Sequence, residues 1–237
     1  MLSLLAALMV VLSGAGCDPE PRFGGRRPPA AEEPQRHVLA GALRGRGGAS
    51  LVVRDAASRV EVRLTDLPGL LYRVSTPADS GLAPAVARTR GRVSIGLRPT
   101  GADGPDIVEI WLNRSVRWDL RLPAGAGEQH LDLAGGRVSR LELGAGTGLI
   151  TMRLPRPRGR VPIIVTGAVG EMAVAIPRGT PLRLHLLGGA DRLAVPWNIQ
   201  PRAAAAGALL APAGWREAPN RYAVTIASEV TTVTIQN

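Results

Sequence analysis

The sequence predicts an all-β fold, a β-solenoid of stacked turns of about 21 residues with two strands each, with additional β-strands as N-terminal and C-terminal caps. Three observations support this prediction. The 29 glycines and 20 prolines are spread so evenly that long helices have no room beyond the N-terminus. Short stretches of alternating apolar and polar residues fill the intervals. A segment of similar outline also recurs every 19 to 22 residues.

The N-terminal segment, residues 1–17, is predicted to be an export signal. Met1 to Leu12 form an uncharged apolar run, too short to cross about 30 Å of hydrocarbon comfortably. Small residues then lead to Cys17, the single cysteine, in a pattern similar to a bacterial lipoprotein signal, so we expect Cys17 to be lipidated. Gly14 stands where such signals usually have Leu. Cleavage near Ala15 and an uncleaved anchor therefore remain alternatives.

Residues 18–50 are predicted to form a flexible tether. They are rich in proline, glycine and arginine, mix both charges and lack apolar periodicity. Residues 51–237 are predicted to form the β-rich solenoid domain, with regular repeats over about 118–196. Strand-like stretches also occupy 50–112 and the C-terminus, and the pattern leaves open whether 51–112 join the solenoid or cap it.

Four segments carry the repeat. They begin at Gly127, Gly148, Gly170 and Gly189, and a second, partner strand lies roughly halfway between successive segments. Because side chains alternate along a strand, each segment should bury one column and expose the other. The predicted inward residues of the four segments are Leu131, Leu133, Met152, Leu154, Val174, Ile176, Leu193 and Val195. The predicted outward residues include His130, Asp132, Thr151, Arg153, Ala173 and Arg192.

The glycines of 144–148 resemble a phosphate-binding loop, but their context predicts a corner of the solenoid. A phosphate loop needs a helix after the glycines, so that the helix N-terminus meets the anion. Here Gly148 is followed by a strand-like stretch, and no GK[ST] follows. We therefore predict no cofactor-binding residues.

The chain carries a net charge of +10, and all 29 of its basic residues are arginine. Codon bias explains such a composition, and an anionic partner is the alternative. The arginines are scattered along the predicted strands and are not grouped into a patch. With 3% aromatic residues, the chain offers few stacking platforms, so nucleic acid is not an expected partner.

No catalytic or metal-binding residues are predicted. His37 lies in the predicted tether, and His130 and His185 fall in outward columns of different strand sets. No HExxH, GxSxG or cysteine–histidine pairing occurs, and the loop of residues 101–106 lacks the ligands of a calcium loop. The four tryptophans lie near the two ends of the regular segment, where they would cap the core or, alternatively, stack on sugars. They are Trp111, Trp118, Trp197 and Trp215.

The repeats at 141–155 and 163–177, LELGAGTGLITMRLP and IIVTGAVGEMAVAIP, resemble the adhesin-type β-solenoid domains of bacteria, also described as toast-rack folds, and the similar C-terminal domains of LiaF-type envelope-stress proteins. The resemblance covers about half of the chain and transfers no catalytic residue. It implies an exported cell-envelope protein.

Together, the signal, the tether and the repeat predict a non-enzymatic, adhesin-like binding or scaffold protein. It would be held at the outer face of the cell membrane by its lipid, with an anionic cell-wall polymer or an envelope protein as partner. A sensory or regulatory subunit of an envelope-stress system is the alternative. A hydrolase of the envelope, with His130 and Asp132 at its site, is the third possibility.

Overall fold

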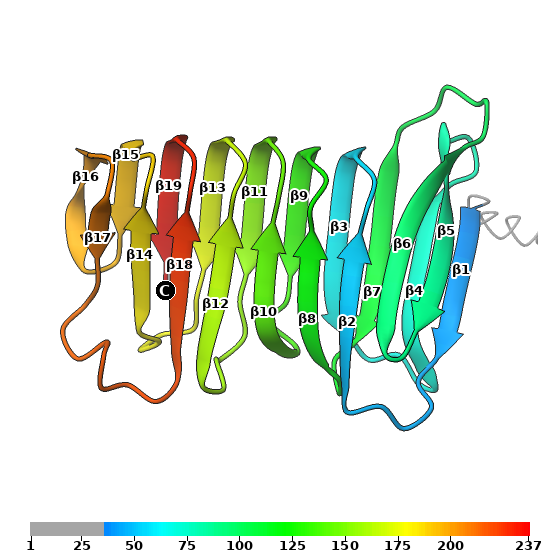
Figure 1. The fold of residues 1–237 in the computed structure, drawn as a ribbon, viewed down its shortest axis with the longest axis horizontal. Helices are drawn as coiled ribbons and strands as arrows, with labels where there is room; N and C mark the ends of the chain where they lie inside the picture. The colour runs from blue at the N-terminus through cyan, green and yellow to red at the C-terminus, as the bar shows by residue number, and fades with distance from the viewer. Residues whose placement is uncertain (1–35) are drawn as a thin grey trace, which may run out of the picture. The chain divides into compact units, whose positions relative to one another are not determined.

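Two β-sheets that face each other make up the computed structural model, which describes residues 36–237 (Figure 1). The all-β solenoid with capping strands is confirmed, since the described residues form strands and turns throughout. None of residues 36–237 lies in a helix long and apolar enough to span a membrane. The predicted signal of residues 1–17, with Cys17, and residues 18–35 of the predicted tether lie outside the described residues.

The ten-stranded sheet is called sheet A and the nine-stranded sheet is called sheet B. The strands of sheet A are β1 (Arg36–Ala42), β3 (Ala57–Thr65), β4 (Leu70–Pro77), β7 (Ile107–Asn113), β9 (Ala126–Asp132), β11 (Thr147–Arg153), β13 (Val169–Ala175), β15 (Ala190–Val195), β16 (Asn198–Ala204) and β19 (Val230–Gln236). The strands of sheet B are β2 (Gly48–Val53), β5 (Leu82–Thr89), β6 (Arg92–Pro99), β8 (Arg117–Leu122), β10 (Arg137–Leu143), β12 (Arg160–Val165), β14 (Leu182–Leu186), β17 (Ala208–Leu210) and β18 (Arg221–Ile226).

A strand of sheet B and the following strand of sheet A form one turn of the solenoid, which we call a rung. Neighbouring rungs pair in parallel in both sheets. In space the rungs follow the order β6–β7, β2–β3, β8–β9, β10–β11, β12–β13, β18–β19 and β14–β15. Residues 51–112 therefore do join the solenoid, through two of these rungs.

The rung order departs from chain order at both ends. The first rung of the chain, β2–β3, lies inside β6–β7, and the last, β18–β19, lies inside β14–β15 (Figure 1). The predicted stacking of Leu193 next to Val174 is therefore wrong: Val174 pairs with Ile235 of β19, and Leu193 pairs with Val233. The apolar alternation of β19 matches that of β15, so the sequence pattern could not show which strand neighbours β13.

The predicted tether ends earlier than residue 50. Residues 36–42 form β1, which pairs antiparallel with β4, and β2 begins at Gly48. His37 therefore lies in a strand. Glycine and proline suggested flexibility here, but the edge of β4 satisfies the backbone of β1 in spite of its poor composition. Antiparallel strands cap both ends of the solenoid: β1, β4 and β5 at one, β16 and β17 at the other.

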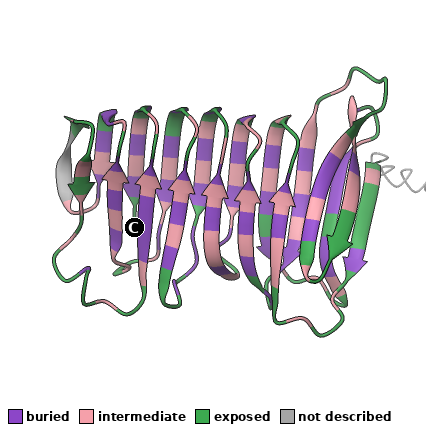
Figure 2. Cartoon of the chain, in the orientation of Figure 1, coloured by how far each residue is buried: buried purple, intermediate pink, exposed green. Residues whose placement is uncertain are grey.

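The core lies between the two sheets and consists of aliphatic columns, visible as aligned buried bands across the rungs (Figure 2). Each predicted inward residue of the four repeat segments is buried. The predicted outward residues are half-buried or exposed. The alternation of faces is thus as predicted.

The glycines of 144–148 form a corner between β10 and β11. The amide of Gly144 donates to the carbonyl of Leu122 in the neighbouring rung. A Cβ on Gly144 would overlap the backbone of Pro123, so only glycine allows the rungs to approach this closely. The prediction of a structural corner agrees with this geometry.

Candidate functional site

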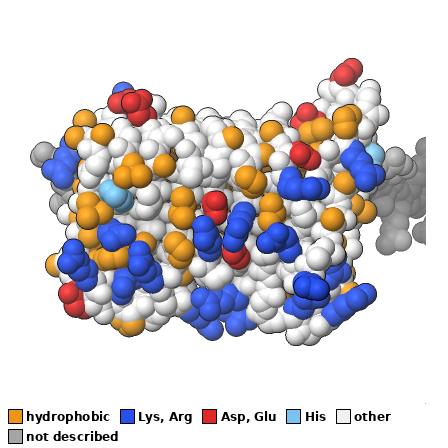
Figure 3. All heavy atoms as spheres, viewed as in Figure 1, with side chains coloured by type: hydrophobic (Ala, Val, Ile, Leu, Met, Phe, Trp, Pro, Cys, Tyr) orange, Lys and Arg blue, Asp and Glu red, His pale blue; other side chains and the backbone are white. Residues whose placement is uncertain are grey.

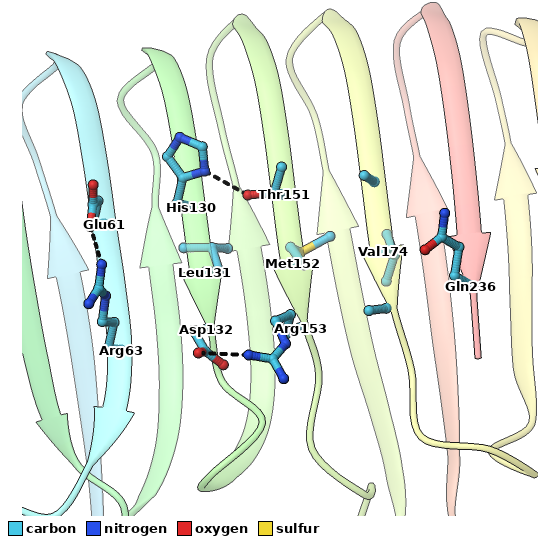
Figure 4. A pocket seen from close by; sticks show the side chains of 12 residues that line it. Glu61, Arg63, His130, Leu131, Asp132, Thr151, Met152, Arg153, Val174 and Gln236 are labelled. Carbon is cyan, nitrogen blue, oxygen red and sulfur yellow. Dashed lines mark hydrogen bonds and ion pairs between the residues drawn. The ribbon is translucent and has the colours of Figure 1, made fainter.

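The outer face of sheet A carries the histidine and the acidic residues considered for catalysis. His130 of β9 lies beside Thr151 of β11, with Nδ1 and Oγ1 2.7 Å apart, and its Nε2 lies 3.1 Å from Glu128 Oε2 (Figure 4). Asp132 accepts from Arg153 at 3.2 Å in the next row. The contacts of His130 with Thr151 and of Asp132 with Arg153 follow the parallel register of β9 and β11.

These side chains form a ladder of pairs, some between neighbouring strands and some between alternate residues of one strand. Arg59 Nε donates to Glu128 at 2.7 Å, and Arg63 donates to Glu61 at 2.8 Å. The hydrogen bond from His130, followed by that from Arg59, lowers the pKa of the Glu128 carboxyl below its ordinary value. Beside this ladder lies an open depression of about 490 Å³, which Ala173, Ala175 and Gln236 border.

This arrangement is suited to holding neighbouring strands together. The carboxylates of Glu61, Glu128 and Asp132 each lie within hydrogen-bond distance of an arginine or histidine, so opposite charges are balanced along the ladder. Among residues 36–237 no group of three histidine, cysteine, aspartate or glutamate side chains could hold a metal ion. The face offers a polar surface with an ordered pattern of charges.

A different pattern lies on sheet B, where five of the nine strands begin with arginine. We call these residues the strand-start arginines, and they are Arg92 of β6, Arg117 of β8, Arg137 of β10, Arg160 of β12 and Arg221 of β18. The strands run parallel, so their first residues share one edge of the sheet. Arg137 pairs in register with Arg117, and Arg160 with Arg221. Basic side chains accordingly gather along the lower half of this face (Figure 3).

The strand-start arginines keep their positive charge unpaired. None of the five forms an ion pair with another residue of the described chain. Higher on the same face, Arg121 pairs with Asp119 at 3.1 Å and Arg140 with Glu142 at 2.9 Å, and those charges cancel. The edge therefore carries uncompensated cations on the four adjacent strands β8, β10, β12 and β18, and Arg92 follows beyond β2, which begins with Gly48.

The expectation that the arginines form no patch is wrong. They are far apart in the chain because each rung takes about 21 residues, but the parallel register returns them to one edge. A signal was present in the sequence: arginine precedes a buried valine or aromatic residue at each strand start, as in Arg117–Trp118, Arg160–Val161 and Arg221–Tyr222.

The tryptophans take several roles. Trp118 is fully buried on β8, well inside the row of rungs, so its predicted place in an end cap is wrong. Its Nε1 donates to the Asn113 carbonyl at 3.0 Å. Trp111 lies under the Arg73 guanidinium at 5.5 Å, and Trp197 packs partly buried against the core. Trp215 is buried at the other end, where arginines cover it.

Fold and surface together define a parallel β-solenoid with one basic edge. Residues 88–175 match the family model described as the N-terminal domain of toast_rack. The structure is similar to that of a "putative cell adhesion protein" from Clostridium sporogenes ATCC 15579, with a TM-score of 0.64 and 15% sequence identity over 86% of this chain and 99% of the other. The search of curated proteins found no match. The resemblance to the toast-rack β-solenoids is thus confirmed.

Proposed function

We propose that this protein is a non-enzymatic, adhesin-like component of the cell envelope that binds an anionic wall polymer along the strand-start arginines. The single observation that carries the proposal is the row of five arginines without carboxylate partners among the described residues. Cations on the adjacent strands β8, β10, β12 and β18 suit an extended polyanion lying across the strands, because each of these strands adds one more contact. The name of the structural neighbour, a cell adhesion protein, supports an adhesive role.

Long-range attraction would bring the polymer to this edge, and salt would screen it. Arginine also forms paired hydrogen bonds with phosphate and carboxylate oxygens, which a lysine row would not provide. On the opposite face, Arg59, Arg63 and Arg153 of sheet A are paired with carboxylates, so we expect that face to contribute less.

The test uses the full-length protein in a nonionic detergent and immobilised wall polymer containing phosphodiesters. A variant with Arg92, Arg117 and Arg137 changed to Gln should bind at least tenfold more weakly. The matched control changes Arg63, Arg153 and Arg192 to Gln on sheet A, removes the same charge and should alter binding less than threefold. Equal losses in both variants would show that net charge alone drives retention. Equally tight binding of DNA would refute selectivity for wall polymers.

We also propose that Cys17 is lipidated and holds the solenoid domain at the outer face of the cell membrane. Cys17 ends an apolar run and is the single cysteine of the chain. Cys17→Ala should release the protein from the membrane fraction or block its processing. Mass spectrometry that finds an unmodified Cys17, or a mature N-terminus elsewhere, would contradict the proposal.

A further inference from the structure

The segment after β17 folds back over the outer face of sheet B. Trp215 of this segment is buried, and its Nε1 donates to the Tyr222 carbonyl of β18 at 2.9 Å. Ala223, the outward residue that follows on β18, is also buried, and its small side chain leaves room for an indole. A turn with Gly214 at a φ of +72° brings Trp215 into this position.

Two guanidinium groups lie against the Trp215 ring. The Cζ atom of Arg183, on β14, is 4.4 Å from the ring centroid, and that of Arg221 is 4.9 Å away. Cation–π attraction of this kind fixes the direction of both side chains. The Nε atoms of Arg183 and Arg221 are nevertheless buried without any hydrogen-bond partner among the described residues. Such donors call for an acceptor.

More positive charge converges on the same place, visible as the cluster at the lower left of Figure 3. Burial, and then the charges of Arg160, Arg216 and Arg221, lower the pKa of the Arg183 guanidinium. Glu217 is the one carboxylate that lines the adjoining depression of about 360 Å³, and it forms no ion pair with the described arginines. Arg183 and Arg216 line this depression, and Arg221 lies against the Trp215 ring that also lines it. Arg160 pairs in register with Arg221 on the neighbouring strand, so four positive charges lie close together here.

We propose that this opening, which we call the Trp215 pocket, binds a phosphate group. Arg183 and Arg216 line it, and Arg221 and Arg160 lie next to it. One carboxylate would be satisfied by a single guanidinium, whereas a phosphate offers several charged oxygens to several donors at once. This inference names phosphate as the group recognised at one end of the strand-start arginines. It rests on the proposed function for the identity of the ligand as a wall polymer. Except for Arg160, the residues of the pocket lie outside the segment that matches the toast-rack family model.

The probes are inorganic phosphate and glycerol phosphate, with acetate at equal ionic strength as the comparison. Binding to the full-length protein in nonionic detergent is followed by tryptophan fluorescence and by calorimetry. We expect phosphate to bind at least tenfold more tightly than acetate. Arg183→Gln should weaken phosphate binding at least tenfold, and Glu217→Gln should strengthen it by a few fold. Arg92→Gln, at the far end of the row, should leave it within twofold.

Arg183→Gln could disturb the packing of Trp215, so Arg216→Gln, at an exposed position, provides a second variant with an expected loss of at least threefold. Phosphate binding that is as weak as acetate binding, or unchanged in both variants, would overturn the proposal. The phosphate group could belong to a lipid head group or to a wall polymer. Vesicles that contain phosphatidic acid are therefore compared with wall polymer, and the Trp215 pocket is assigned to the one that competes with free phosphate. If the polymer fails to bind while phosphate still does, the pocket stands and the proposed polymer function falls.

Discussion

Val174 and Ala173 are consecutive residues of β13 but face opposite sides of sheet A. Val174 is 2% exposed in the core, between Met152 and Ile235, whereas Ala173 lies on the outer face. Val174→Asp would place an unpaired carboxylate among aliphatic side chains and should cost about 3–5 kcal/mol of unfolding free energy. Ala173→Ser should change it by no more than about 0.5 kcal/mol. Urea unfolding measures both, and equal midpoints would contradict the assigned faces.

The same alternation explains which residues could be predicted from the sequence. Inward and outward positions follow from a period of two within one strand, so each column could be assigned without knowing its neighbours. The strand-start arginines and the Trp215 pocket could not be found in this way. Arg183, Trp215 and Arg221 meet only because β14 and β18 are adjacent and the intervening segment folds back, and these are properties of pairing across strands.

Glu128 provides a test of the sheet A ladder by pH. Its pKa is lowered in the folded protein, so its contacts with His130 and Arg59 stabilise the fold above the pKa of an unfolded glutamate, near 4.5. This stabilisation should disappear as the pH falls through the lower, folded value. Glu128→Gln should therefore have a lower urea midpoint than the unmodified protein at pH 7, and the difference should shrink at an acidic pH below 4.5, where the folded carboxyl takes up its proton. An unchanged difference at both pH values would rule out an ionic contribution.

At the scale of elements, the central solenoid follows the predicted repeat, and the exception is the insertion of β18–β19. Both β15 and β19 present alternating apolar residues, with Leu193 and Val233 inward. Either strand could therefore cover β13 with the same burial. The choice depends on the connecting segments, and no short-range pattern in the sequence specifies it.

Engineered disulfides can test this strand order. Adjacent strands are about 4.8 Å apart, within the range of about 4.4–6.8 Å between Cα atoms that a disulfide spans, whereas strands two apart lie near 10 Å. In a Cys17→Ser background, Ala173→Cys with Thr234→Cys should form a disulfide under mild oxidation, since the two residues pair in register. Ala173→Cys with Ala194→Cys should stay reduced because β19 intervenes. A thiol assay distinguishes them, and oxidation of the second pair would favour simple sequential stacking.

At the scale of the whole described domain, the insertions change what the outermost rungs can do. In a sequential solenoid each rung contacts only its neighbours, so a terminal rung can detach as a free tail. Here β14–β15 lies along the chain between β13 and β18, and these two strands belong to neighbouring rungs inside it. A detached β14–β15 would become a closed loop over residues 176–220. A free tail gains conformational entropy when it detaches. By chain-entropy estimates, closing a loop of this length reduces the free energy gained from that entropy by roughly 4 kcal/mol.

We therefore expect the amide hydrogens of the end rung to exchange with solvent at the same urea concentration as those at the centre of the solenoid. The end rung should not open first. In hydrogen-exchange mass spectrometry at increasing urea, peptides from β14 and β15 should lose protection together with those from β10 and β11. The edge strand β1 pairs with β4 alone among the described strands and should exchange first. Insertion of a specific protease site at the exposed Arg178–Gly179 turn supplies the control. Cleavage there opens the loop, restores the lost entropy and should make β14 exchange well before β10. Loss of protection that proceeds inward from β14 in the uncut protein would show that the closed loop contributes nothing to cooperativity.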